Sequence, residues 1–183
     1  MKSMNKIFMV ILKILEVLHW IGSVSMIAVF ILSLTGGAGI RNIAELAGAE
    51  GDTMLNTYGY EVSFTDNTGT LSLKAIAMFA IGSVFILSLM AMVFRNAYLI
   101  TKKSRHTTPF QKDNIRMVRE IGIFTIAIPA IALIMTCVIH LVFGSGIETS
   151  VRFDSIVIGI VALALTNVFA YGAELQTDVD GLL

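Results

Sequence analysis

Charge is scarce in this chain. Only 14% of its 183 residues are Asp, Glu, Lys or Arg, whereas soluble domains contain about a quarter. Hydrophobic residues make up 56% of the sequence, and the mean hydropathy is +0.82. A soluble domain of this size cannot cover so much apolar surface. The composition therefore excludes the soluble class and predicts an integral membrane protein.

Cysteine is scarce as well, and familiar catalytic motifs are absent. The single cysteine, Cys137, excludes a disulfide within the chain. The sequence contains no H-E-x-x-H metal motif, no G-x-S-x-G nucleophile motif and no pair of membrane aspartates. We therefore predict no enzymatic activity, no cofactor and no metal site. The absence of an internal repeat or a low-complexity linker indicates a single membrane domain over residues 1–183.

What the sequence does contain is four apolar runs, each close to the length of about 20 residues that crosses a bilayer as a helix. The predicted spans are residues 14–34, 73–94, 121–143 and 155–173. Lys13 and Glu16 interrupt the first run, which favours an uncleaved span over the competing interpretation, a signal peptide. The predicted fold class is an all-α integral membrane protein, an up-down bundle of four transmembrane helices.

Charges are sorted between the two sides of the predicted bundle. Residues 95–120 hold seven of the 13 Lys and Arg residues but only two acids, Asp113 and Glu120. Short loops rich in Lys and Arg stay in the cytoplasm, so this loop, both termini and the tail at 174–183 are predicted inside. Three basic residues are predicted outside: Arg41, Lys74 and Arg152.

The predicted outside loop, residues 35–72, forms a small extracytoplasmic cap between the first two spans. Residues 41–47 are expected to form a short helix. Residues 58–64 (YGYEVSF) have strand character, residues 66–69 suit a turn, and residues 70–73 can pair back to complete a β-hairpin. Two interpretations of this cap stay open, a sensing or binding module and a structural lid over the bundle.

The central basic loop contains a predicted helix start. Thr108 can cap the helix with its hydroxyl, Pro109 suits the first helical position, and Gln111 can reach back to the cap. No evident break follows before Pro129, so the helix is expected to continue into the third span and to kink at that proline.

Three basic side chains share one face of that helix, at i, i+4 and i+7: Lys112, Arg116 and Arg119. This face is either a solvated surface over anionic headgroups or a docking face for an acidic partner. Two acids of the tail, Glu174 and Asp178, fall at i and i+4 if the last helix continues. Pairing between these acids and the basic face would lock the loop to the tail.

Few ionisable residues lie inside the predicted spans. Glu16 and His19 share a helical face near the cytoplasmic end of the first span, where side chains can also snorkel to water. They are the single acid–base candidate among the spans. His140 lies near the outer end of the third span, and about 30 Å of membrane separates it from His19, which argues against a shared haem.

Two motifs carry a resemblance to a known family. The first consists of Thr108-Pro109-Phe110 followed by Asn114, Arg116 and Ile121-Gly122. The second is the ending AELQTDVDG at residues 173–181. Together with the four-span layout and the large first outside loop, these motifs resemble the bacterial membrane proteins grouped as domain of unknown function 2975.

The resemblance implies a four-helix protein of the bacterial inner membrane without assigned chemistry. Genes of such proteins commonly neighbour a small helix-turn-helix regulator, which implies a membrane partner for a transcription factor. The motif positions on the predicted cytoplasmic side are Pro109, Phe110, Asn114, Arg116, Glu174 and Asp178. With Lys112 and Arg119 they make up the predicted cytoplasmic interaction face.

The sequence therefore predicts a non-enzymatic regulatory or interaction protein, and the resemblance implies that it holds a small helix-turn-helix transcription regulator at its cytoplasmic face. The alternative is a small oligomeric transporter or channel component, which would need polar residues along a route or broken helices. An intramembrane enzyme would have to rely on Glu16 and His19 alone. The expected partners are the lipid bilayer, such a regulator and a second copy in a homo-oligomer, without direct binding to nucleic acid.

Overall fold

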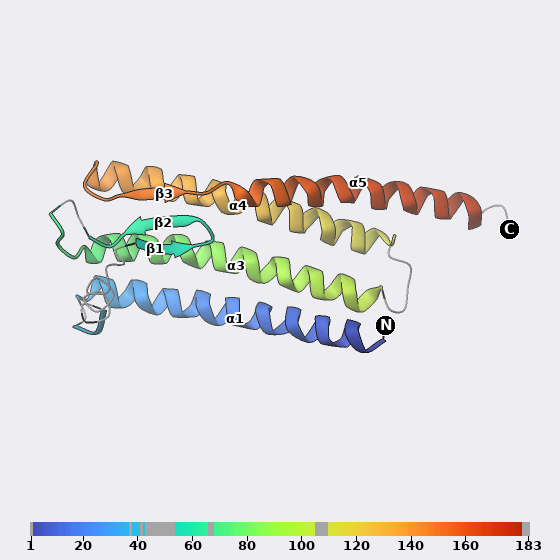
Figure 1. The fold of residues 1–183 in the computed structure, drawn as a ribbon, viewed down its shortest axis with the longest axis horizontal. Coiled ribbons are helices and arrows are strands. Elements are labelled where there is room, and N and C mark those ends of the chain that lie inside the picture. The colour runs from blue at the N-terminus through green and yellow to red at the C-terminus, as the bar shows by residue number, and fades with distance from the viewer. Residues whose placement is uncertain are drawn as a thin grey trace. The chain divides into compact units, whose positions relative to one another are not determined.

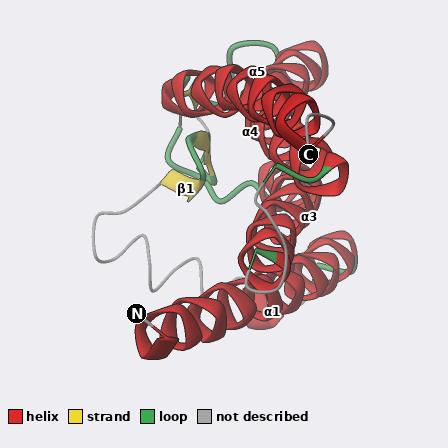
Figure 2. Cartoon of the chain, turned by 90° about the vertical axis from the view of Figure 1, so that its right-hand side faces the viewer, coloured by secondary structure: helices red, strands yellow, loops and turns green. Residues whose placement is uncertain are grey.

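Helices dominate the computed structural model, which describes residues 2–36, 38–40, 42, 54–65, 68–104 and 110–180. Within these residues lie four long helices, α1 (Lys2–Leu34), α3 (Leu73–Lys103), α4 (Lys112–Phe143) and α5 (Asp154–Asp180) (Figure 1). Three short strands accompany them, β1 (Met54–Thr57), β2 (Tyr60–Ser63) and β3 (Thr149–Val151). Figure 2 shows how small the strand content is beside the helices.

The four long helices match the four predicted spans in number and order. They contain 33, 31, 32 and 27 residues, which at 1.5 Å per residue is about 40–50 Å each. By length and composition all four can cross a membrane. The prediction of four membrane-length helices is confirmed, and the chain fits a multi-pass membrane protein.

Two of these helices extend well into the predicted basic loop. α3 continues to Lys103 and α4 begins at Lys112, so most of residues 95–120 is helical. Lys and Arg are good helix formers, and no Gly or Pro interrupts residues 95–104, so helix α3 does not stop where the apolar run stops. The hydropathy pattern therefore marked the apolar segments but not the ends of the helices.

The start of α4 differs from the prediction. Thr108 and Pro109 lie outside the described residues, but Phe110 and Gln111 are described and are not helical. The first backbone hydrogen bond of the helix runs from Ile115 N–H to the Gln111 carbonyl at 3.1 Å, so Gln111 is the N-cap. The prediction that Pro109 opens this helix is wrong, because α4 begins at Lys112, and Phe110 instead packs against α5.

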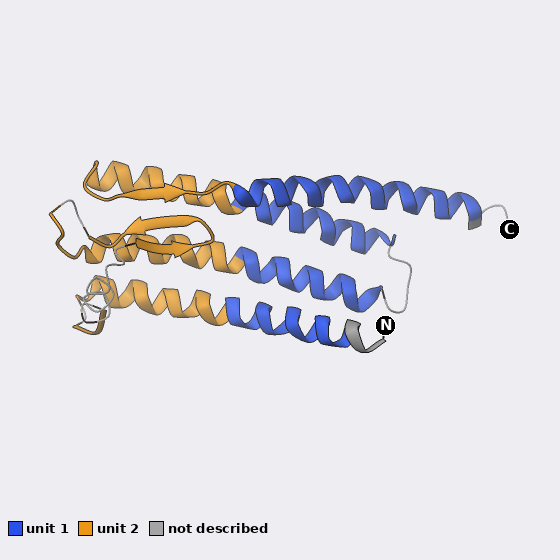
Figure 3. Cartoon of the chain, viewed as in Figure 1, with its two compact units in different colours: residues 1–19, 89–127, 154–183 blue, residues 20–88, 128–153 orange. Residues whose placement is uncertain are grey.

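The chain divides into two compact units (Figure 3). Unit 1 combines residues 1–19, 89–127 and 154–183, and unit 2 combines residues 20–88 and 128–153. Helices α1, α3 and α4 each contribute residues to both units, whereas α5 belongs to unit 1 and the three strands belong to unit 2.

Unit 2 contains an antiparallel sheet with the strand order β1-β2-β3. β1 and β2 form a hairpin in which Met54 pairs with Ser63 and Thr57 with Tyr60. Tyr58 and Gly59 make its turn with φ of 51° and 83°, and two successive positive φ values are typical of a type I′ turn. β3 comes from the loop between α4 and α5 and pairs with β2, so the sheet joins two loops that are distant in sequence.

The predicted cap is confirmed in part. Residues 60–63 of the predicted strand form β2, but its hairpin partner is the preceding segment Met54–Thr57 and not residues 70–73. Those later residues keep a single bridge, Thr65 to Leu71, beside a hydrogen bond from Ser72 N–H to the Phe64 carbonyl. The short helix expected at 41–47 falls outside the described residues except for residue 42, which is helical.

Tyr60 fastens this sheet to helix α3. Its side chain is fully buried, its ring stacks on Phe79 at a centroid distance of 5.5 Å, and its hydroxyl donates to the Met78 carbonyl at 3.4 Å. Gly82 leaves room for the ring, because a Cβ there would lie 2.5 Å from Tyr60 Cε1. The buried hydroxyls of Thr57 and Ser83 add a hydrogen bond of 3.0 Å between the hairpin and the same helix.

We expect Gly82→Ala to destabilise the protein by about 1–3 kcal/mol, because the added methyl overlaps a ring that packing holds in place. Thermal unfolding of the detergent-solubilised protein measures the effect. Gly39→Ala is the matched control, since a Cβ there meets nothing within 4 Å. Equal unfolding temperatures for the two variants would show that Tyr60 is not confined by Gly82.

A second prediction concerns alkaline pH. Burial raises the pKa of Tyr60 above its ordinary value of 10.0, because the buried phenolate loses hydration. The unfolded chain ionises near pH 10 while the folded protein keeps the proton. The contribution of Tyr60 to stability is therefore intact below about pH 10 and is lost progressively as the pH rises towards the raised pKa, by about 1.4 kcal/mol per pH unit at most.

Unfolding in denaturant at about pH 9 and about pH 11 should show a larger loss of stability for the wild type than for Tyr60→Phe. Tyr171→Phe serves as the control, because Tyr171 is exposed and its replacement should leave the alkaline loss unchanged. The same alkaline loss in all three proteins would contradict the prediction.

Candidate functional site: a charged cluster at the ends of α3 and α4

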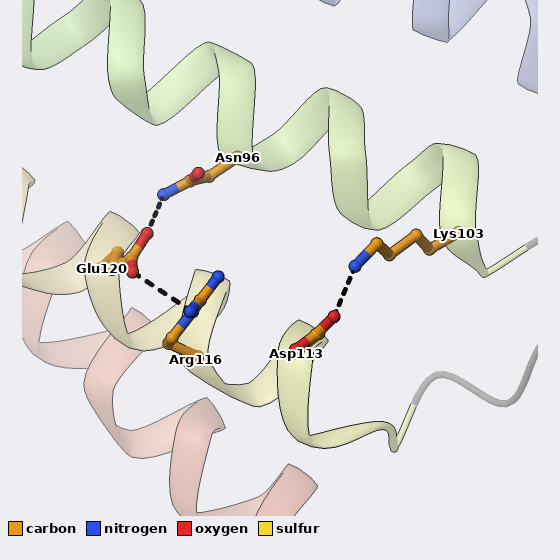
Figure 4. Close-up of polar contacts among 5 residues, drawn as sticks. All are labelled: Asn96, Lys103, Asp113, Arg116 and Glu120. Atoms are coloured by element: carbon orange, nitrogen blue, oxygen red, sulfur yellow. Dashed lines mark hydrogen bonds and ion pairs between the residues drawn. The ribbon is translucent and has the colours of Figure 1, made fainter.

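The last turns of α3 and the first turns of α4 face each other in unit 1 through polar side chains (Figure 4). Asn96 Nδ2 donates to Glu120 Oε2 at 2.9 Å, and Lys103 Nζ lies 2.7 Å from Asp113 Oδ2. The two contacts are seven residues apart on each helix and run in opposite directions along the sequence. They therefore align the two helices as antiparallel neighbours over about two turns.

Glu120 is the centre of this cluster. Its second oxygen, Oε1, lies 3.5 Å from Nε of Arg116, which is one turn earlier on the same helix. Asn96 is buried, and about a third of the Glu120 side chain is exposed. A partly buried carboxylate needs donors to replace water, and the amide of Asn96 supplies one of them from the neighbouring helix.

Lys103 and Asp113 form a more exposed pair further along the two helices. With 40% and 59% of their side chains accessible, water screens the attraction, and the pair contributes little to stability. Asp113 also lies in the first turn of α4, where a negative charge favours the helix dipole. Both acids of the basic segment are therefore occupied by donors from the same segment.

Phe110 joins this segment to α5. Its ring meets the Phe169 ring edge-on at 5.9 Å between centroids. Gly172 makes the approach feasible, because a Cβ at that position would lie 2.7 Å from Phe110 Cε1. Loop and last helix are thus in contact, but through aromatic packing against a glycine and not through the predicted pairing of charges.

Two further glycines bring α4 and α5 close together. A Cβ on Gly122 would lie 2.8 Å from Leu163 Cγ, and a Cβ on Gly159 would lie 2.5 Å from Ile126 Cγ1. Small residues at helix contacts are typical of membrane helix pairs, where close packing replaces the hydrophobic effect.

The predicted interaction face is only partly assembled as expected. Three basic residues are exposed on α4: Lys112, Arg116 and Arg119. Of these, Arg116 forms an ion pair with Glu120. In the described part of the chain no carboxylate lies within 4.0 Å of Lys112 or Arg119.

The remaining predicted positions of that face do not form one surface with these basic residues. Asn114 is fully buried, so it belongs to the packing of α4 and is no surface contact. Glu174 and Asp178 are exposed on α5, and neither forms an ion pair with a described Lys or Arg. Pro109 lies outside the described residues.

The candidate pair in the first span has separate partners. Glu16 is buried and lies 2.9 Å from Lys13 Nζ. His19 donates its Nδ1–H to the Leu15 carbonyl at 2.7 Å, and its ring lies 4.9 Å from the Phe94 ring. The other span histidine, His140, has ring nitrogens 3.1 Å from the Gly144 carbonyl and 3.1 Å from the Thr149 hydroxyl, so it joins the end of α4 to β3.

The contact between Asn96 and Glu120 was not predicted from the sequence, in which Glu120 was only an acid that opposes the basic residues. One signal was available in the sequence. Asn96 directly follows Arg95, which was predicted to end the second span, and a buried amide needs a hydrogen-bond partner if the helix continues past that point. The distance between Asn96 and Glu120 depends on how α3 and α4 pack, and no local pattern encodes it.

Comparisons of the chain with family models, curated proteins and solved structures found no match. The resemblance to the family of unknown function therefore stays a prediction.

We expect Asn96→Ala to lower the free energy of unfolding by about 1–2 kcal/mol, because Glu120 loses its donor from α3. Chemical unfolding at neutral pH measures the loss, and Asn167→Ala, at an exposed position of α5, is the matched control. In a double-mutant cycle with Glu120→Gln the two effects should be non-additive. Additive effects would refute a direct coupling between the two side chains.

Proposed function

We propose that this chain is a non-enzymatic multi-pass protein of the bacterial inner membrane, an up-down four-helix bundle with both termini in the cytoplasm. Its function would be to hold a small helix-turn-helix regulator at the basic face of α4, defined as Lys112, Arg116 and Arg119. The supporting observation for an acidic partner is the charge that remains at this face after the internal pairs are counted.

The internal acids of the cluster are already engaged. Asp113 pairs with Lys103, and Glu120 is held by Asn96 and Arg116. Lys112 and Arg119 are exposed, and within the described residues they have no carboxylate within 4.0 Å. Complementary charge steers association and sets specificity, so an acidic surface on a cytoplasmic protein is the partner that suits these two side chains.

The rigidity of the face supports the same function. Asn96 and Glu120 tie α4 to α3, and Phe110 packs against Gly172 of α5. Exposed cations on a helix that is held from two sides lose less conformational freedom on binding than cations on a loose loop. The partner type, a small DNA-binding regulator, comes from the family resemblance of the sequence.

The alternative of a transporter or channel has less support. Polar side chains inside the helices of unit 2 bond to each other at short range, as in the contact of 3.0 Å between the Ser23 and Ser88 hydroxyls. Transport would need such groups to line a route that crosses the membrane.

The proposal predicts that a DNA-binding regulator co-purifies with the tagged protein from membranes of its own host. The double variant Lys112→Glu/Arg119→Glu should lose this protein, whereas Lys74→Glu, an exposed reversal at the start of α3, should retain it. About 0.5 M salt should release the partner, because it shortens the screening length to a few ångströms.

Quantitative mass spectrometry compares the amount of DNA-binding protein recovered with the wild type, with Lys112→Glu/Arg119→Glu and with Lys74→Glu. Recovery of no DNA-binding protein, or equal recovery with all three baits, would exclude a regulator held by the basic face.

A further inference from the structure

Two lysine side chains from different helices converge on one aromatic ring in unit 1. Lys13 Nζ of α1 lies 5.6 Å from the centroid of the Tyr98 ring, and Lys102 Nζ of α3 lies 5.9 Å from the same centroid. Both distances allow a cation–π contact. Two like charges close to a single ring repel each other, so the arrangement calls for negative charge nearby.

The carboxylate at this place satisfies only one of the two lysines. Glu16 lies 2.9 Å from Lys13 Nζ. Lys102 is exposed, and no described carboxylate lies within 4.0 Å of it. A positive charge therefore stays exposed beside the ring.

A third cation adds to this surface. Arg95, Tyr98 and Lys102 follow one another at i, i+3 and i+7, which places them on one face of α3. Arg95 is exposed, and within the described residues it also has no carboxylate within 4.0 Å. We call the group Lys13, Arg95, Tyr98 and Lys102 the Tyr98 cradle. After Glu16 neutralises Lys13, the cradle carries two positive charges.

The position of the cradle along the helices matches the membrane interface. Lys13 directly precedes the predicted span 14–34, and Arg95 directly follows the predicted span 73–94. At 1.5 Å per residue, Tyr98 lies about 6 Å beyond the end of the latter span, within the headgroup layer of a bilayer. One turn towards the membrane from Lys13, Val17 exposes 45% of its surface and offers apolar contact for an acyl chain.

We propose that the Tyr98 cradle binds the phosphate of an anionic phospholipid headgroup. Lys102 and Arg95 supply the charge, and the Tyr98 hydroxyl supplies a hydrogen-bond donor. Lys13, oriented by Glu16, closes the cradle from α1. This inference rests on the membrane placement in the proposed function but not on the regulator, since it involves α1 and α3 and none of the residues of the basic face.

Native mass spectrometry of the full-length protein tests the proposal. The protein is released from mixed micelles that contain equal amounts of phosphatidylglycerol and phosphatidylcholine. The wild type should retain phosphatidylglycerol in preference to phosphatidylcholine. Lys102→Gln, which alters an exposed side chain, should weaken retention about fivefold, and Arg95→Gln should do the same.

Lys74→Gln is the matched control and should retain phosphatidylglycerol like the wild type. Lys112→Glu/Arg119→Glu should retain it as well, which separates this site from the face proposed for the regulator. Circular dichroism of every variant confirms that the helices are intact.

Equal retention of the two lipids by the wild type, or unchanged retention by both Lys102→Gln and Arg95→Gln, would overturn the proposal. Addition of millimolar inorganic phosphate distinguishes the source of the anion. Phosphatidylglycerol that stays bound supports a lipid site, whereas its complete displacement by free phosphate would refute one.

Discussion

Backbone hydrogen bonding inside apolar helices is the constraint on which the rest of this structure depends. A chain with so little charge can cross a membrane only if each segment satisfies its own N–H and C=O groups, and the α-helix does this locally. Hydroxyl side chains follow the same rule, because Ser25, Thr125 and Thr166 all donate to the carbonyl four residues earlier in their own helix. Polar side chains can therefore occur within the helices without a partner on another helix.

Contacts between helices then depend on a few positions with special properties. In unit 2 a buried tyrosine takes the space that Gly82 leaves open, and the Tyr60 ring fixes the sheet on α3. In unit 1 the carboxylate of Glu120 bridges α3 and α4, and Gly172 admits the ring of Phe110 to α5. The aromatic rings fit against the helices at glycines, whereas the amide of Asn96 and the carboxylate of Glu120 form a directional hydrogen bond between α3 and α4.

Positive charge at the ends of the helices in unit 1 is only partly balanced. Lys13, Lys103 and Arg116 have carboxylate partners, and four other exposed cations among the described residues, Lys112 with Arg119 and Arg95 with Lys102, form two separate groups. One group lies on α4 and suits an acidic protein surface. The other surrounds Tyr98 on α3 and suits a phosphate at the membrane interface. The two groups would have different requirements, because membrane topology depends only on the sign of loop charge, whereas recognition of a partner depends on its geometry.

The sequence by itself determined the four long apolar helices, because hydropathy and helix propensity are properties of neighbouring residues. It also revealed the basic segment at 95–120 and part of one strand, β2. Only the tertiary structure decided that β3 joins the hairpin, that Glu120 binds Asn96, and that Tyr98 meets Lys13 of α1. These contacts join residues 24 to about 90 positions apart. Their geometry depends on how helices pack, and a local pattern of residues carries no information about that distance.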